Sequence, residues 1–208
     1  MILDKFRVDG KVAVVTGGTK GMGRAIAYAL AEAGADIVAV SRKPNPEQEE
    51  EILALGKRYL HIPADLTDRE QTMAVIPKAV EAMGTVDILV NNAGMVKAVR
   101  ALECSEEIWD HTVELDMNSA FFLSQAAAKI MKEKGYGKII SVASVLGFQG
   151  GYWAISYATA KHGIVGMTKA FSNECSKYGV RVNAVAPSYI ETELTGPISL
   201  LICLILAS

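Results

Sequence analysis

Residues 11–40 read KVAVVTGGTKGMGRAIAYALAEAGADIVAV. The run KVAVVT at 11–16 is apolar and β-branched, which is typical of a buried strand. The glycine-rich turn TGGTKGMG follows it, and an amphipathic segment at 22–33 ends next to Gly34, a residue type that favours a helix end. DIVAV at 36–40 has the pattern of a second strand. A strand, a helix and a strand in this order predict a right-handed βαβ unit with two parallel strands.

The same alternation continues along the chain and predicts an α/β fold. We expect further strands at 59–64, 87–92, 138–143 and 181–186, and further helices at 47–56, 68–83, 106–134 and 155–178. Strands that alternate with helices form a parallel sheet covered on both faces, so we predict a doubly wound, Rossmann-type sheet. The segment SRKPNPEQEE at 41–50 is loop-like and predicts a short or irregular second crossover helix.

Length and composition predict one domain, residues 1–208, because 208 residues suffice to bury a substantial core. The net charge of −2 offers no surface for a polyanion, so we expect no nucleic-acid partner. The charged N-terminus is no secretory signal, and the odd number of cysteines fits reduced thiols, which together predict a cytoplasmic protein. The cysteines and histidines lack metal-ligand spacing, so we expect no metal at Cys104, Cys175, Cys203, His61, His111 or His162.

The glycine turn after the first strand predicts a dinucleotide site. Gly17, Gly21 and Gly23 follow a G-x-x-x-G-x-G spacing. Glycine permits a tight turn and a close approach of the backbone to a ligand, and the helix N-terminus that follows favours a pyrophosphate. A glycine cluster by itself is more often an ordinary turn, so this motif gains weight only from the rest of the chain.

A tyrosine and a lysine in SYATAKHG at 156–163 predict an acid and base. Tyr157 and Lys161 stand at i and i+4, so a helix projects them from one face. An ordinary tyrosine titrates near pH ~10, and a nearby cation favours its ionised form, which brings it towards the working pH. The alternative is a packed ring beside a solvated amine. Ser144, at the end of a predicted strand, completes the candidate site.

Five motifs, taken in order, resemble the short-chain dehydrogenase/reductase family over about residues 8–195. They are TGGTKGMG, NNAG at 91–94, Ser144, the pair of Tyr157 and Lys161, and VNAVAPSYIETEL at 182–194. The resemblance implies that Tyr157 exchanges a proton with the substrate oxygen, that Ser144 binds the same oxygen, and that Lys161 tunes the tyrosine and binds the nicotinamide ribose. It implies a cofactor site made of Gly17, Thr19, Gly21, Met22, Gly23, Ser41, Arg42, Asp65, Leu66, Asn91, Ala93, Gly94, Tyr157, Lys161, Ile190 and Thr192. Asp65 has an alternative role as a cap of the next helix.

The choice between NAD and NADP stays open. An acidic residue at the end of the second strand would bind the ribose hydroxyl of NAD, whereas an arginine accommodates the phosphate of NADP. Ser41, Arg42 and Lys43 favour NADP. The relatives that the chain resembles most favour NAD.

One position departs from the family pattern. The family usually has an asparagine in the helix before the strand that leads to the catalytic serine, where it supports a proton relay to the lysine. In this chain the segment LDMNSAFFLSQ at 115–125 has Asp116 at that position. Asn118 lies two residues too far along the chain to take its place. A carboxylate cannot donate as an amide does, and it adds negative charge near Lys161. We therefore expect Asp116 to reduce turnover.

Four segments resemble the sugar-acid branch of the family, of the 2-deoxy-D-gluconate 3-dehydrogenase and 2-dehydro-3-deoxy-D-gluconate 5-dehydrogenase type. They are ADIVAVSRKP at 35–44, NNAGMVKAV at 91–99, FFLSQAAAK at 121–129 and VLGFQGGYWAISYATAKHG at 145–163. Such an enzyme interconverts a secondary alcohol and a ketone on a sugar acid. Lys97 is a candidate partner of the substrate carboxylate. Gln149, Tyr152 and Trp153 are candidate polyol contacts beside Ser144. The alternatives are a 3-oxoacyl-carrier-protein reductase and a cofactor-binding protein with weak catalysis.

The C-terminal segment 196–208 does not match the family. ISLLICLILA at 198–207 is apolar but too short for a helix across a bilayer, so we expect no membrane partner. We expect the family's usual last strand to be missing, through a truncated or frameshifted reading frame. The family assembles through its two long helices, so we expect a homodimer through 106–134 and 155–178 and no tetramer.

Overall fold

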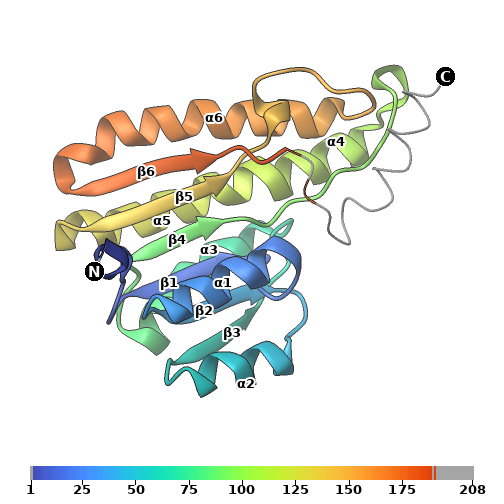
Figure 1. Ribbon diagram of the computed structural model, residues 1–208. Helices are drawn as coiled ribbons and strands as arrows, with labels where there is room; N and C mark the ends of the chain where they lie inside the picture. Colours follow the sequence, from blue (N-terminus) through green and yellow to red (C-terminus); the bar gives the residue numbers. More distant parts are fainter. Residues whose placement is uncertain (1, 189, 191–208) are drawn as a thin grey trace.

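The computed structural model describes residues 2–188 and 190, and these form a six-stranded parallel sheet in the order β3-β2-β1-β4-β5-β6 (Figure 1). This confirms the predicted doubly wound fold. We also predicted that the chain lacks the family's usual last strand. That prediction concerns residues outside the part of the chain that the structure describes. The strands are β1 Val12–Thr16, β2 Asp36–Ser41, β3 Tyr59–Pro63, β4 Ile88–Asn91, β5 Gly137–Val142 and β6 Val180–Val185.

Helices cover both faces of this sheet. They are α1 Gly21–Glu32, α2 Pro46–Ala54, α3 Arg69–Met83, α4 Glu106–Val113, α5 Ser119–Lys134 and α6 Ile155–Cys175, with short 3-10 turns at Ile2–Phe6, Ala101–Glu103, Val145–Gly147 and Ser176–Tyr178. Successive strand residues point to opposite faces, so Val14 packs under α3 and α5 while Val15 packs under α1 and α2. Both faces are therefore dry, which explains the almost wholly apolar strands.

The order of the strands creates a crevice beside β1. From β1 the chain runs outward to β2 and β3, then crosses back and places β4 on the other side of β1, with Val15 paired to Val90. Connections that leave two neighbouring strands in opposite directions open a crevice at their carboxyl ends, which is where doubly wound sheets bind ligands. The glycine turn leaves β1 at this edge.

The predicted helix at 106–134 is wrong in one respect, because the structure divides it. Between α4 and α5 a π-helical turn, Glu114–Asn118, inserts an extra residue into the spiral. The apolar spacing runs through both helices, so nothing in the pattern marks the turn. Single π turns occur frequently at functional sites, and this one carries the fully buried Asp116.

The second crossover is short, as predicted, but it is a regular helix. Pro46 occupies its first turn and the Asn45 side chain accepts a hydrogen bond from the Gln48 backbone N–H at 3.1 Å. An asparagine cap followed by proline is a strong start signal, and it explains why a segment rich in loop-forming residues becomes helical. Among residues 2–188 and 190, no helix is both long and apolar enough to span a bilayer.

Candidate active site

The predicted site residues lie at one edge of the sheet. The glycine turn follows β1, Ser41 ends β2, Asp65 follows β3, Asn91 ends β4 and Ser144 follows β5. All the strands are parallel, so their carboxyl ends meet at this edge. The fold therefore gathers residues that are far apart in the sequence.

The glycine turn is packed tightly against the first turn of α1. A Cβ placed on Gly23 would lie 2.8 Å from the Gly17 carbonyl carbon and closer still to its oxygen. Gly17 has a positive φ of 62°, which glycine adopts without strain. Gly21 and Met22 begin α1, whose N-cap Lys20 makes no side-chain capping bond. The first N–H groups of α1 are thus left for an anionic ligand.

Two residues tie this turn to β4: Asn92, from the NNAG motif, and Thr16, which opens TGGTKGMG and was given no role from the sequence. The Thr16 hydroxyl accepts hydrogen bonds from the backbone N–H groups of Asn92 at 2.9 Å and Ala93 at 3.0 Å. The Asn92 side-chain amide donates to the Thr16 carbonyl at 2.9 Å. These bonds set the width of the crevice between β1 and β4. The feature of the sequence that could have pointed to Thr16 is its polar side chain at the end of an otherwise apolar strand.

Two residues of the second crossover hold the turn from the other side. The fully buried Gln48 amide donates to the Gly18 carbonyl at 2.8 Å, and Asn45 donates to the Thr19 carbonyl at 3.0 Å. The pattern predicted only that this crossover helix is short or irregular, and it gave neither residue a role in the site. A glutamine inside a run of acidic residues carries no visible signal that it turns inward.

Serine, arginine and lysine stand at the end of β2, where a dinucleotide places its adenosine ribose. The Thr19 hydroxyl donates to Ser41 Oγ at 3.0 Å, and Ser41 Oγ donates to the Lys43 carbonyl at 2.7 Å. A ring nitrogen of His61 lies 3.0 Å from the same Ser41 oxygen. Arg42 and Lys43 are exposed, so two cations border this corner.

Asp65 does not cap the next helix, so that alternative is wrong. Asp68 caps α3, accepting from the Gln71 backbone N–H at 3.1 Å. Asp65 accepts hydrogen bonds from the Thr67 backbone N–H at 3.0 Å and the Thr67 hydroxyl at 2.8 Å, and these lower the pKa of Asp65. The neighbouring Leu66 is buried in the core.

Where β5 meets α6, Lys161 lies beside Tyr157 and is bonded to the segment that leads into Ser144. Lys161 Nζ donates to the Val142 carbonyl at 3.0 Å and lies 5.3 Å from the centre of the Tyr157 ring. Ser144 is buried, with its hydroxyl accepting from the Leu146 backbone N–H at 3.2 Å. A Cβ on Gly147 would lie 2.9 Å from the Lys161 carbonyl oxygen, so the turn after Ser144 packs directly on α6.

Asp116 forms a buried ion pair with Lys161. One carboxylate oxygen, Oδ1, accepts from the Met95 backbone N–H at 2.9 Å, and the other, Oδ2, lies 3.3 Å from Lys161 Nζ. Burial raises the pKa of Asp116, and the lysine charge opposes that shift. Gly94 leaves the space for this pair, because a Cβ there would lie 2.6 Å from Oδ2. Asn118 instead donates to Glu114 at 2.7 Å.

The predicted substrate residues lie on two neighbouring segments. The Val99 backbone N–H donates to the Trp153 carbonyl at 2.8 Å, which sets the segment after β4 that carries Lys97 beside the loop that carries Gln149 and Tyr152. Lys97, Gln149 and Tyr152 are exposed. Trp153 has a φ of 56°, a conformation that a bulky residue adopts only under strain.

The last predicted cofactor contacts fall at the border of the described chain. Ile190 is described and is 44% exposed. Thr192 lies outside the described residues. In the part of the chain that the structure describes, no cluster of His, Cys, Asp and Glu side chains is suited to a metal ion.

The edge fits a dinucleotide. The Gly17 and Gly23 positions have no room for a side chain, and the start of α1 is left without a side-chain cap. Asn91 is buried at the end of β4; its amide nitrogen donates to Ser124 at 2.9 Å, while its Oδ1 accepts no hydrogen bond from the residues that the structure describes. A backbone open to close approach and a buried polar atom in need of a partner are both expected of a cofactor crevice.

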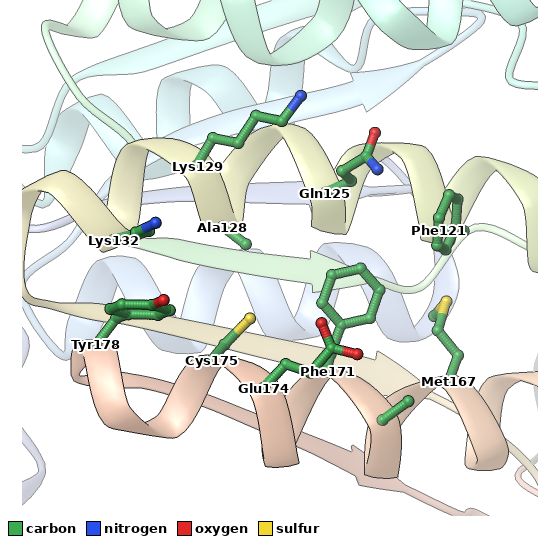
Figure 2. Close-up of a pocket in the computed structure, with 11 residues that line it drawn as sticks. Phe121, Gln125, Ala128, Lys129, Lys132, Met167, Phe171, Glu174, Cys175 and Tyr178 are labelled. Atoms are coloured by element: carbon green, nitrogen blue, oxygen red, sulfur yellow. The ribbon is translucent and has the colours of Figure 1, made fainter.

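A second hollow lies between α5 and α6. It is a groove of about 570 Å³, and Figure 2 shows Phe121 on the α5 side with Phe171, Met167 and Tyr178 on the α6 side. The rings of Phe121 and Phe171 lie 5.8 Å apart. None of Ser144, Tyr157 and Lys161 lines this groove. It is therefore separate from the candidate active site.

Comparison with known proteins agrees with this geometry. Residues 11–200 match the family model for short chain dehydrogenase. The chain is 46% identical to 2-dehydro-3-deoxy-D-gluconate 5-dehydrogenase of Escherichia coli over 94% of this chain and 78% of that one. It is 39% identical to the 3-oxoacyl-[acyl-carrier-protein] reductase of Vibrio cholerae, over 91% of this chain and 78% of the relative.

Solved structures give the same result. A protein from Beutenbergia cavernae, assigned as an NAD(P)-dependent gluconate 5-dehydrogenase and holding NADP, superposes with a TM-score of 0.89. It is 38% identical, and the match covers 94% of this chain and 78% of that one. The resemblance drawn from the motifs, including that to the sugar-acid branch, is confirmed. The chain belongs to the short-chain dehydrogenase family and is an NAD(P)-dependent oxidoreductase.

Proposed function

We propose that this protein interconverts a secondary alcohol and a ketone on a small sugar acid, of the 2-deoxy-gluconate or 2-keto-3-deoxygluconate type. The observation that carries this is the position of Lys161, beside the Tyr157 ring and bonded to the carbonyl of Val142, two residues before Ser144, at the sheet edge that also holds the glycine turn. The 46% identity to a dehydrogenase of that substrate class supports it.

The three side chains divide the chemistry. Ser144 binds the substrate oxygen, and Tyr157 gives a proton to that oxygen in ketone reduction or takes it in alcohol oxidation. Lys161 is anchored by the Val142 carbonyl, so its ammonium is held near the Tyr157 ring, where it stabilises a phenolate and can bind the nicotinamide ribose. A bound nicotinamide dinucleotide supplies the hydride donor or acceptor.

The remaining residues position the two ligands. The turn with Gly17, Thr19, Gly21, Met22 and Gly23 holds the pyrophosphate. Asp65 and Leu66 border the adenine, Asn91, Ala93 and Gly94 line the crevice, and Ile190 is assigned to the carboxamide. Ser41 and Arg42 face the ribose, where NADP gains from the exposed cations and NAD remains the alternative.

The substrate carboxylate is assigned to Lys97. Its segment is joined to the Trp153 segment by the Val99 hydrogen bond, so an acid held there is close to the loop with Gln149 and Tyr152. Their amide, phenol and indole groups suit the hydroxyls of a polyol.

The test is binding followed by turnover. Nicotinamide fluorescence should detect binding of NADH or NADPH, and alcohol oxidation or ketone reduction should follow with gluconate or 2-keto-3-deoxygluconate. Tyr157→Phe should keep cofactor binding and lose turnover. Cofactor binding by the unmodified chain with no turnover on any substrate would favour the cofactor-binding alternative over an active enzyme.

A second candidate is reduction of 3-oxoacyl thioesters. The 39% identity to the carrier-protein reductase and the exposed Arg42, which suits NADPH, favour it. Turnover of acetoacetyl thioesters at a higher kcat/KM than sugar acids would select this candidate. The exposed polar side chains of Gln149 and Tyr152 suit an acyl chain less well.

We also propose a homodimer through α5 and α6. The groove between them is lined by Phe121 and Phe171, and Phe121 is 37% exposed although its ring lies 5.8 Å from that of Phe171. A second copy of the chain would cover these rings. Light scattering should give twice the chain mass, and Phe121→Glu should return the protein to the mass of one chain.

A further inference from the structure

The pairing of Asp116 with Lys161 differs from the other ion pairs of the described residues, because both of its side chains are buried. Lys161 is 4% exposed and Asp116 is 0% exposed, whereas Asp87 has a partner, Lys134, that is 33% exposed. An ion pair shielded from water on both sides is screened little by salt and acts strongly on nearby groups.

The carboxylate is held in place from two sides. Its Oδ1 accepts from the Met95 backbone N–H at 2.9 Å, and the π turn Glu114–Asn118 fixes its backbone. Its Oδ2 accepts no hydrogen bond in the described chain but faces Lys161 Nζ at 3.3 Å. Asp116 therefore acts on the ammonium chiefly through its charge.

The lysine is divided between three neighbours. An ammonium has three N–H donors. One donates to the Val142 carbonyl, another side faces Asp116, and the remaining side faces the Tyr157 ring, whose centre is 5.3 Å away. The carboxylate thus offsets part of the positive charge by which Lys161 stabilises a Tyr157 phenolate.

Other ionisable groups near Asp116 are few. Lys161 comes from α6, as does Tyr157, and His111 acts on Asp116 from α4. The segment after β4 supplies the Met95 backbone N–H, and β5 supplies the Val142 carbonyl. Of these groups, Lys161 is the cation in ion-pair contact with the carboxylate.

We propose that Asp116 is a charge-balancing and positioning residue, which offsets part of the Lys161 charge and so moves alcohol oxidation by Tyr157 to a more alkaline range than an uncharged residue at 116 would require. The inference rests on the proposed function of Tyr157 and Lys161.

The kinetic test compares the pH profile of kcat/KM for alcohol oxidation in the unmodified chain and in Asp116→Asn, which has nearly the same shape and no charge. The rising limb should move to lower pH by about one unit, so that oxidation on that limb is about tenfold faster in the variant. Asp116→Ser, smaller and also uncharged, should move it in the same direction. Coincident profiles for all three proteins would overturn the proposal.

Asp87→Asn is the matched control. Asp87 is also buried and paired to a lysine, Lys134, but it lies at the opposite end of the sheet, before β4. Its removal should leave the pH profile in place. A profile that moves equally in Asp87→Asn and Asp116→Asn would show a general response of the fold and would refute a role specific to Asp116.

A measurement without substrate separates this inference from the proposed function. Tyrosine labelled with ¹³C at ring carbon Cζ reports ionisation of each phenol by NMR, and the Tyr157 signal is identified by its loss in Tyr157→Phe. The ionisation midpoint of that signal should be lower in Asp116→Asn than in the unmodified chain. A lower midpoint without turnover on sugar acids would support the charge balance and refute the proposed substrate, and an unchanged midpoint would refute the charge balance alone.

Discussion

Replacement of Gly23 by alanine tests how the glycine turn is built. A Cβ at this position would lie 2.8 Å from the Gly17 carbonyl carbon and 2.5 Å from Asn92 Nδ2. Ordinary van der Waals contact begins at 3.4 Å, so the carbonyl carbon must retreat by about 0.6 Å and its oxygen, which is nearer, by more. The carbonyl belongs to the backbone of the turn, and Asn92 is held by its bond to Thr16, so neither group moves freely.

The expected cost follows from that collision. Extra atoms in a packed site cost about 1–3 kcal/mol, because the neighbours leave their preferred positions. For a chain of this size each kcal/mol lowers Tm by about 2–4 °C, so a loss of about 2 kcal/mol lowers Tm by about 4–8 °C. The turn opens at the atoms that would face the pyrophosphate. The Kd of the cofactor should therefore rise about tenfold or more, which corresponds to about 1.4 kcal/mol.

Differential scanning fluorimetry gives the Tm, and nicotinamide fluorescence gives the Kd. Gly166→Ala is the control, because Gly166 lies within α6 and a Cβ there would meet no atom within 4 Å. Alanine in a helix is favoured over glycine by about 0.5–1 kcal/mol, so this variant should keep cofactor affinity and gain stability. If Gly23→Ala bound the cofactor as tightly as Gly166→Ala, the close packing of the turn would have no part in binding.

Further predictions concern the hydrogen bonds and charges of the site. Tyr157→Phe should lower kcat by about 10²–10⁴-fold in steady-state assays, since that is the contribution of a positioned acid or base; unchanged hydride exchange would contradict the assignment. Gln48→Ala leaves the Gly18 carbonyl without its buried donor, so it should cost about 1–3 kcal/mol by chemical denaturation and weaken cofactor binding. Arg42→Ala should raise the Kd of NADPH more than that of NADH in parallel titrations, and equal changes would favour a role for Arg42 outside the ribose corner. Burial raises the pKa of Asp116 above its ordinary value of 3.8, so its ionisation weakens the fold as pH rises through the folded-state pKa. Only the unmodified chain loses stability in this way, so the Tm difference between Asp116→Asn and the unmodified chain should increase from about pH 4 upward. A decrease in that difference over the same range would contradict a raised pKa of Asp116.

The sheet was predictable because its strands are buried on both faces. Runs such as VAVVT in β1 and DIVAVS in β2 have apolar residues at odd and even positions alike, a pattern that parallel strands between two helical layers require. The π turn between α4 and α5 was not predictable. It depends on tertiary contacts of Asp116 with Met95 and Lys161, and a helical apolar period does not encode those contacts.

The sequence predicted those site residues whose side-chain type is required by the proposed reaction or by cofactor binding. Gly17, Gly23, Tyr157 and Lys161 belong to motifs whose order carries information beyond each residue. The bracing residues Thr16 and Gln48 were missed, because a threonine at a strand end and a glutamine in a polar helix are common in every fold. Their roles become visible only when the ends of β1, β4 and the second crossover meet in space.

A contribution to the free energy of unfolding does not explain why residue 116 carries a charge. Replacing a buried ion pair with uncharged groups is often neutral or stabilising, because the paired charges do not fully recover their lost hydration. An uncharged side chain at 116 would leave Lys161 still anchored by the Val142 carbonyl, and the Met95 N–H could still donate to an amide oxygen. The fold therefore does not require the carboxylate, whereas the charge felt by Tyr157 changes directly with it. On this reasoning, removal of the charge should alter the pH dependence of turnover more than it alters folding.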